Sequence, residues 1–298
     1  MKVALIILNY NDFENTKNYI EIMKTYNIIN KIIVVDNKST NDGELENLKS
    51  LKNAKVDVIQ TSKNAGYASG NNFGLRYIDN IYKNKFEYVI ISNPDVSVDE
   101  EAIQKTINFM EENKNVAIAS PRMNFVNGPA RRSAWKKRTF LIDVACCTRL
   151  TEFLLNPILK KGEYNSDLNK EYLKVFAIAG SFFIARHDKF KEVEYFDENT
   201  FLFFEEDILG SKFQQKGYEI YSLNNINFLH YDSQCIGKLM NMFKKQDFLF
   251  DSRIYYHKKY NKINKLQVCI FEVLRYVRKI ELLIELPIKK IYSLLKKK

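Results

Sequence analysis

A chain of 298 residues in which 46% are hydrophobic is long enough for one large domain with an appendage, and this composition excludes global disorder. The formal charge of +10 is concentrated at one end: residues 236–298 carry 16 Lys and Arg against 5 Asp and Glu, whereas residues 1–235 carry 30 against 31. A nucleic-acid binder spreads positive charge over its reading surface, so a neutral body with a basic tail predicts no nucleic-acid partner.

The first half of the chain alternates short apolar runs with helical patterns, which predicts a mostly parallel sheet flanked by helices. Its spacing fits a nucleotide-binding α/β half. In chain order, the expected strands are Val3–Leu8, Ile32–Val35, Val56–Ile59, Tyr88–Ile91 and Val116–Ala119, and the expected helices are Phe13–Tyr26, Asp42–Leu51, Ala68–Tyr82 and Glu100–Glu112.

The second half is less regular. Thr139–Tyr172 is expected to be helical, and Val175–Ala185 is expected to form a strand that crosses Gly180. Glu205–Lys216 has a helical pattern, and Gly217 is placed to end that helix.

An acidic motif directly follows one of the predicted strands. Asn93-Pro94-Asp95 comes after the apolar run Tyr88–Ile91, and the proline stops the strand because it cannot donate to a sheet ladder. Asp95 is thereby brought to the C-terminal edge of the sheet, where open α/β sheets bind ligands. Asn, Pro and Asp are also ordinary turn formers, so a simple turn is the alternative.

Two further segments have the residue types of a nucleotide site. Asp36 ends the second predicted strand, where a carboxylate can accept hydrogen bonds from a base or a ribose, although the polar residues after it also suit a helix N-cap. Gly66 lies at a predicted helix start, where glycine lets the backbone approach a ligand, and Asn71 can reach out from the first turn. The glycines from Gly66 to Gly74 are four apart, so this is not the dinucleotide fingerprint.

Together these motifs, in this order, resemble the inverting family 2 glycosyltransferases, and within them the bacterial rhamnosyltransferase-type enzymes of surface-polysaccharide synthesis. The resemblance is carried by Leu5–Asn11, Val34–Thr40, Asn64–Ala68, Asn71–Gly74, Asn93–Asp95, Gly180-Ser181, Phe196–Glu198 and Phe203–Asp207. It implies a GT-A-like α/β catalytic domain over residues 1–235, with a nucleotide-sugar-binding half (1–120) and an acceptor and catalytic half (121–235), followed by a basic helical tail (236–298).

The resemblance also implies a donor site and a metal. Asp36 would bind the nucleotide base, and Asp95 would hold a divalent cation, Mg or Mn, on the donor diphosphate, with His230 beside the phosphates or the metal. A hard cation with oxygen ligands offsets the charge that a departing nucleoside diphosphate gains. Asn93 stands where the family has an acidic residue and offers at best a neutral oxygen, so we expect a modest metal affinity that the diphosphate mainly supplies. The implied donor-binding residues are Asn9, Asp36, Asn64, Gly66, Asn71, Asn93 and Asp95.

An inverting transferase needs a base for the acceptor hydroxyl. The family places an acid pair at a helix start, and strict register puts Glu206 on the catalytic position, with Asp207 as its rival. Acids also favour a helix N-terminus through the dipole alone. Arg131, Arg132, Trp135 and Gly180 could line the acceptor side, because arginine suits phosphate and tryptophan stacks on sugars, although a solvated basic loop fits the arginines equally well.

From Leu266 onward apolar residues recur at steps of three and four between basic ones, which predicts an amphipathic basic helix or helix pair broken near Pro287. Such a helix can lie on an anionic membrane surface or pack its stripe on the catalytic domain, and we favour the membrane. The opening apolar run is too short for a signal peptide, and the cysteines contain no CxxC pair. We therefore expect a cytoplasmic protein at the inner membrane face.

The sequence thus predicts a metal-dependent, inverting transferase that moves a sugar, rhamnose as a first guess, from a dTDP or UDP donor to a glycan or lipid-linked acceptor. One rival is a nucleotidyltransferase, but Leu8–Glu14 lacks the glycines and basic residues of a triphosphate loop. The other is a sugar-nucleotide-binding scaffold whose catalytic acids have drifted, which the neutral Asn93 and the shifted acid run support.

Overall fold

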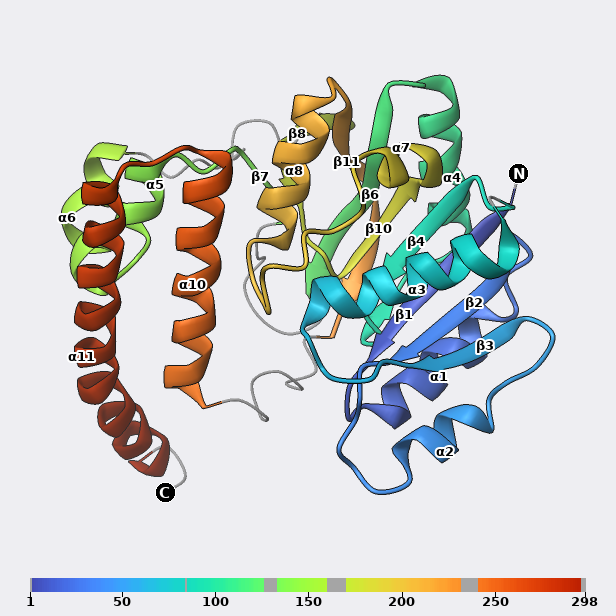
Figure 1. Ribbon diagram of the computed structural model, residues 1–298, viewed down its shortest axis with the longest axis horizontal. Coiled ribbons are helices and arrows are strands. Elements are labelled where there is room, and N and C mark those ends of the chain that lie inside the picture. The colour runs from blue at the N-terminus through green and yellow to red at the C-terminus, as the bar shows by residue number, and fades with distance from the viewer. Residues whose placement is uncertain (1, 84, 126–132, 160–169, 232–240, 296–298) are drawn as a thin grey trace.

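The computed structural model describes residues 2–83, 85–125, 133–159, 170–231 and 241–295. Its centre is a mixed sheet with the strand order β3-β2-β1-β4-β10-β6-β11-β5, to which β8 adds beside β11 (Figure 1). The strands are β1 (Val3–Asn9), β2 (Ile29–Asp36), β3 (Val56–Gln60), β4 (Tyr88–Ser92), β5 (Val96–Ser97), β6 (Val116–Phe125), β8 (Tyr172–Val175), β10 (Phe182–Arg186) and β11 (Glu219–His230).

Helices cover both faces of this sheet because alternate side chains of each strand point to opposite faces. Val3, Leu5 and Ile7 of β1 belong to the core under one set of helices, and Ala4 and Ile6 to the core under the other. The first set is α1 (Phe13–Met23), α2 (Glu44–Lys49) and α4 (Glu100–Glu112), and the second is α3 (Tyr67–Tyr82), α7 (His187–Glu192) and α8 (Glu205–Gln215). The predicted α/β fold is confirmed, and each predicted element of the first half is present.

The strand predicted across Gly180 is wrong in one respect, because the chain leaves the sheet there. It forms β9 (Ala177–Ile178), which pairs with β7 (Ala134–Trp135), and then β10, which runs antiparallel between β4 and β6. The backbone N–H of Gly180 donates to the Glu206 carboxylate and its carbonyl accepts from the Tyr67 hydroxyl. Both backbone groups are therefore used outside the strand ladder, and the strand is interrupted at this residue.

The helices at the other side of the molecule gather into a second layer (Figure 1). They are α5 (Phe140–Ala145), α6 (Arg149–Leu159), α10 (Met242–Tyr260) and α11 (Lys265–Leu295). Phe250 of α10, Phe271 of α11 and Cys147 form a small core, and Tyr256 of α10 packs on Phe204 and Ile208 at the start of α8.

The predicted break near Pro287 is wrong, since α11 runs through the proline as one helix of 31 residues. An interior proline removes one backbone hydrogen bond, and the remaining ones hold the helix together. Among the described residues, no helix has an apolar stretch of the length and hydropathy needed to span a membrane.

A buried ion network joins α10 to the rest of the chain through Asp143 of α5. Its Oδ2 atom lies 3.0 Å from Arg253 Nε and 2.9 Å from His257 Nε2, and all three side chains are at most 3% exposed. Burial alone raises the pKa of the Asp143 carboxyl, but the charge of Arg253 and the hydrogen bond from His257 outweigh it and hold the pKa below its usual range.

We expect Asp143→Asn to lower the free energy of unfolding by about 3–5 kcal/mol, because it leaves the Arg253 charge buried without its counter-ion. Since the folded pKa is lowered, the stabilisation from Asp143 is complete above the ordinary aspartate pKa of about 4 and is lost on acidification, a dependence that the variant should lack. Urea denaturation at several pH values measures both effects. Asp188→Asn, on the surface of α7, is the matched control and should change stability by less than about 0.5 kcal/mol.

Candidate active site

Three parallel strands end at one edge of the sheet and bring their polar residues together there. Asn9 ends β1 directly beside Asp36 at the end of β2, and Asn93 follows the end of β4. Residues 88–91 of β4 and 3–7 of β1 are fully buried and apolar. Burial on both faces fixes the register of these strands, and the register fixes the positions of the residues at their ends.

Asp36 is completely buried and bound by protein donors. Its Oδ1 atom accepts from the amide of Asn9 and from both the backbone N–H and the hydroxyl of Ser39, and its Oδ2 atom accepts from Gln60 at 2.7 Å. Asn9 in turn accepts from the Thr16 hydroxyl. Asn9 is fully buried and holds Asp36 from the interior, whereas Gln60, its partner on the neighbouring strand, is half-buried. The contact of Asp36 with a nucleotide base stays a prediction.

The glycine loop before α3 is held from two sides. Asn37 donates to Asn64 Oδ1 at 3.1 Å and to the Gly66 carbonyl, and Asn64 Oδ1 also accepts from the Gly66 N–H. Gly66 has a φ of +97°, and a Cβ there would lie 2.1 Å from the carbonyl oxygen of Phe201. Glycine is thus required by both conformation and close approach. Asn37 was not identified as a site residue from the sequence, because its contacts are with the loop and depend on the fold.

Asn71 lies one turn into α3 and is fully buried. Its amide nitrogen donates to the Tyr67 carbonyl at 3.0 Å, while its Oδ1 atom has no hydrogen-bond partner among the described residues. A buried amide oxygen without a hydrogen-bond partner is energetically costly. A ligand that donates a hydrogen bond to the Asn71 oxygen would remove this cost.

The candidate metal residues lie together. His230, at the end of β11, has its Nε2 atom 3.2 Å from Asp95 Oδ1, and the pairing of His230 with Val96 of β5 sets this approach. Both side chains are at least 85% buried. A carboxylate and an imidazole suit Mn²⁺ or Mg²⁺ in part. In the part of the chain that is described, no three His, Cys, Asp or Glu residues gather as a metal cluster.

The Gly180-Ser181 turn connects these parts. The Asn93 N–H donates to the Ser181 carbonyl at 2.8 Å, and the Tyr67 hydroxyl donates to the Gly180 carbonyl at 2.6 Å. The Gly180 N–H donates to Glu206 Oε1 at 3.1 Å. One turn therefore holds the acidic motif, the glycine loop and the catalytic candidate in contact.

The acidic run at the start of α8 contains three side chains in different environments. Phe203 and Phe204 adopt the left-handed region, with φ of 75° and 67°, a conformation that non-glycine residues adopt only when the surroundings impose it. Glu205 and Asp207 are buried, and Glu206 is half-buried. Burial raises the pKa of Glu205 well above its ordinary value and raises the pKa of Glu206, which the Gly180 N–H and the Arg138 charge lower in part.

Asp207 is engaged by protein groups. Its Oδ1 atom accepts from Trp135 Nε1 at 3.0 Å and lies 3.4 Å from Arg138 Nε. Burial raises the pKa of Asp207 to about 7 against the lowering effect of the Arg138 charge. The Arg138 guanidinium also covers the Trp135 ring and reaches Asp143 at 3.7 Å. Trp135 is only 8% exposed, so here it supports Asp207, a contact that sequence reasoning did not anticipate.

Arg138 itself was missed. It stands in a basic stretch of the sequence, where nothing marks it as the residue that lies between two buried carboxylates. Arg131 and Arg132 lie outside the described residues.

We expect Gly180→Ala to lower the turnover number about tenfold, because a Cβ at this position would lie 2.9 Å from Glu206 Oε1 and displace the carboxylate. Steady-state kinetics at saturating donor would measure the loss. The control is Gly217→Ala, which meets no atom within 4 Å but has a φ of +74°, so it reports the effect of backbone strain away from the site. Equal turnover in Gly180→Ala and the parent would contradict the placement of Glu206.

Comparison with known proteins identifies the family of the chain. The family model described as glycosyl transferase family 2 matches residues 4–194. The low-salt glycan biosynthesis hexosyltransferase Agl10 of Haloferax volcanii is 28% identical over 207 residues, which are 68% of this chain and 59% of that protein. An uncharacterized mimivirus protein, L142, is 25% identical over 146 residues, which are 46% of this chain and 30% of that protein. The chain thus matches only part of the length of either relative.

Solved structures share the fold. S. aureus TarS 1-349 in complex with UDP-GlcNAc has a TM-score of 0.58 and 15% identity, covering 92% of this chain and 70% of that one. The mannosyltransferase PcManGT from Pyrobaculum calidifontis, in complex with GDP-Man and Mn²⁺, has a TM-score of 0.56 and 12% identity, covering 92% and 69%. With the family model spanning well over half of the residues, this chain belongs to glycosyl transferase family 2 and has the GT-A glycosyltransferase fold.

Proposed function

We propose that this chain is an inverting, metal-dependent glycosyltransferase that transfers a sugar from a nucleoside-diphosphate donor to a glycan or lipid-linked acceptor in cell-surface polysaccharide synthesis. The observation that carries the proposal is the Gly180-Ser181 turn. Asn93 of the acidic motif and the half-buried Glu206 bind to the two adjacent residues of this turn, and a site that holds a diphosphate beside a base requires such proximity.

Glu206 is the proposed base. Its carboxylate takes the proton of the acceptor hydroxyl while that oxygen attacks the anomeric carbon, and the bond from this carbon to the diphosphate breaks with its electron pair on the leaving group. Because attack and departure are on opposite faces, the anomeric configuration inverts. Glu206 is favoured over Asp207 since both Trp135 and Arg138 already bind Asp207 in the interior.

Asp95 and His230 are the proposed protein ligands of the cation, Mn²⁺ or Mg²⁺. When bound, the cation supplies positive charge to the leaving diphosphate. Asn93 contributes its backbone N–H to the Ser181 carbonyl, which fixes the loop that carries Asp95. The solved neighbour PcManGT was crystallised with Mn²⁺, which supports a divalent cation here.

The donor and acceptor follow from the resemblance. We propose rhamnose from dTDP-rhamnose first and a UDP-hexose second, with Asp36 at the base and Asn64, Gly66 and Asn71 along the donor. TarS was solved in complex with UDP-GlcNAc and PcManGT in complex with GDP-Man, so both donors belong in the test. Arg131 and Arg132 would face a phosphorylated acceptor, and the basic C-terminal helices would hold the protein on the inner face of an anionic membrane.

Turnover of nucleotide sugars tests the proposal. The full chain is incubated with Mn²⁺ and dTDP-rhamnose, UDP-glucose, UDP-GlcNAc or GDP-mannose, and release of nucleoside diphosphate is measured with and without a membrane extract that supplies acceptor. Release with one donor, abolished by chelator, is the expected result. Binding of a nucleotide without any release would favour the scaffold alternative instead.

A further inference from the structure

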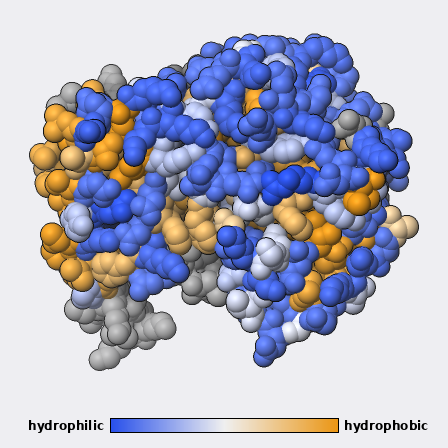
Figure 2. Space-filling model, viewed as in Figure 1, coloured by the Kyte–Doolittle hydropathy of each residue, from blue (hydrophilic) through white to orange (hydrophobic). Residues whose placement is uncertain are grey.

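The helical layer exposes an unusual amount of apolar surface on α6 and α11 (Figure 2). Figure 2 shows this surface as the hydrophobic area over these helices, at the left of the view. Phe153 of α6 is 79% exposed, which is extreme for a side chain of its size. The exposed apolar side chains on these two helices include Phe153, Leu154, Val273, Ile280, Leu283 and Ile284.

This surface is separate from the face by which α11 packs on the protein. Phe271 and Leu282 of α11 are fully buried, and Phe271 belongs to the core shared with α10. Val273, Ile280 and Ile284 follow helical spacing on another side of the helix, where they are about 60% exposed. The stripe predicted from the sequence is therefore divided between an internal contact and an open face.

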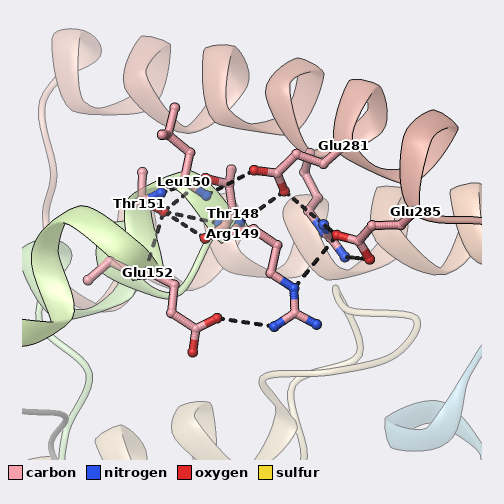
Figure 3. A network of polar contacts seen from close by, with 9 residues as sticks. Thr148, Arg149, Leu150, Thr151, Glu152, Glu281 and Glu285 are labelled. Carbon is pink, nitrogen blue, oxygen red and sulfur yellow. Dashed lines mark hydrogen bonds and ion pairs between the residues drawn. The ribbon is translucent and has the colours of Figure 1, made fainter. Parts of the chain in front are cut away.

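A polar clamp fixes α6 against α11 (Figure 3). The first two N–H groups of α6, those of Arg149 and Leu150, donate to the carboxylate of Glu281 at 2.9 and 3.0 Å. Arg278 binds both Glu281 and Glu285, and Arg149 lies 3.6 Å from Glu285. Since Glu281 caps the α6 N-terminus, the start of α6 is fixed to α11.

Ion pairs also neutralise the acidic residues of α11. The three acidic residues of α11, which are Glu272, Glu281 and Glu285, all pair with arginines. In sequence, Lys289 and Lys290 lie in the last part of α11 and Lys296–Lys298 follow it. The helix thus combines an open aliphatic face with basic residues at its C-terminal end, and that combination is complementary to anionic lipid.

We propose that α6 and α11 form one membrane-docking platform that lies on an anionic lipid bilayer, with Phe153 and Leu154 of α6 inserted beside Ile280 and Ile284 of α11. This rests on the membrane association proposed above and assigns it to a two-helix surface in place of a tail alone. Neither helix has the apolar length to span the bilayer, so the platform lies in the interface.

The test is flotation of the full-length protein with vesicles of phosphatidylglycerol and phosphatidylcholine in equal parts, and with phosphatidylcholine alone. Parent protein should float with the anionic vesicles. The double variants Phe153→Asp with Leu154→Asp, and Ile280→Asp with Ile284→Asp, should each reduce the bound fraction at least about tenfold. The control is Ile22→Asp with Ile81→Asp, two exposed side chains on α1 and α3, which should float like the parent.

The variant Glu281→Ala distinguishes membrane binding by the two-helix platform from binding by electrostatic attraction alone. It removes an acid, so a purely electrostatic surface would bind anionic vesicles more tightly. The platform predicts about threefold weaker binding, because α6 is no longer held in place. Tighter binding of Glu281→Ala, or a parent-like α6 double variant, would overturn the two-helix platform.

Calorimetric nucleotide binding and sedimentation velocity on the same preparations keep the outcomes distinct. A parent that does not float, but forms a dimer that Phe153→Asp with Leu154→Asp dissociates, would show a protein–protein interface and overturn the proposal. If the parent protein does not bind any nucleotide, the result counts against the transferase function, and the flotation result stands unchanged.

Discussion

Glu206→Gln is expected to lower the turnover number about 1000-fold while leaving nucleotide binding unchanged, since a positioned general base contributes a factor of roughly 100 to 10,000. The amide oxygen of glutamine can still accept from the Gly180 N–H, so the local structure should persist while the proton acceptor is lost. Single-turnover transfer with saturating donor, compared with calorimetric binding of the nucleotide, separates chemistry from binding.

The pH dependence of the parent adds a second readout. The carboxylate of Glu206 must be deprotonated to act, and burial raises its pKa above the ordinary glutamate value. Turnover should therefore rise with pH through a pKa displaced upward from that of an exposed glutamate. Asp207→Asn is the rival variant: if it abolishes transfer with its melting temperature unchanged, while Glu206→Gln remains active, the base is Asp207.

Asp95→Asn should weaken metal-dependent binding of the nucleotide at least about 100-fold, which corresponds to about 2.7 kcal/mol. An amide has the shape of a carboxylate but no charge, so it cannot offset the charge of the cation. Titration of UDP, dTDP and GDP, each with Mn²⁺ and with chelator, measures the effect and identifies the preferred base.

Asp99→Asn is the matched control, because Asp99 is an exposed aspartate at the start of α4 in the same stretch of chain. It should bind nucleotide like the parent. If Asp95→Asn binds normally and still responds to chelator, the cation is held elsewhere and His230 loses its assigned role as well.

The sequence was sufficient for the fold because its strongest signals are local. Runs such as Tyr88–Ile91 are apolar without interruption, and only a strand buried on both faces requires that pattern. The interruption at Gly180 could not be seen, because it depends on two partners, Tyr67 and Glu206, that are distant in sequence. Likewise Pro287 predicts a break from local rules, and the packed helix continues through it.

The candidate site was predicted to a lesser extent. Asp95 and His230 lie in contact, although nothing local connects residues so far apart in the chain, and their role as metal ligands stays a prediction. Arg138 and the buried role of Trp135 escaped prediction since a basic, aromatic stretch has the same composition whether it binds a ligand or supports a carboxylate. The hydrogen bond from Gln60 to Asp36 was not foreseen either, since it is set by the register of the neighbouring strand.

The contact between Tyr256 of α10 and the first residues of α8 bears on how this protein can be handled and altered. A shortened version ending at residue 235 would look attractive for crystallisation, because residues 236–298 carry all of the net positive charge. It would also strip Phe204 and Ile208 of their cover and leave Asp143 without Arg253 and His257. Solubility should therefore be sought by point changes on the outer side of α11, with the full chain kept intact.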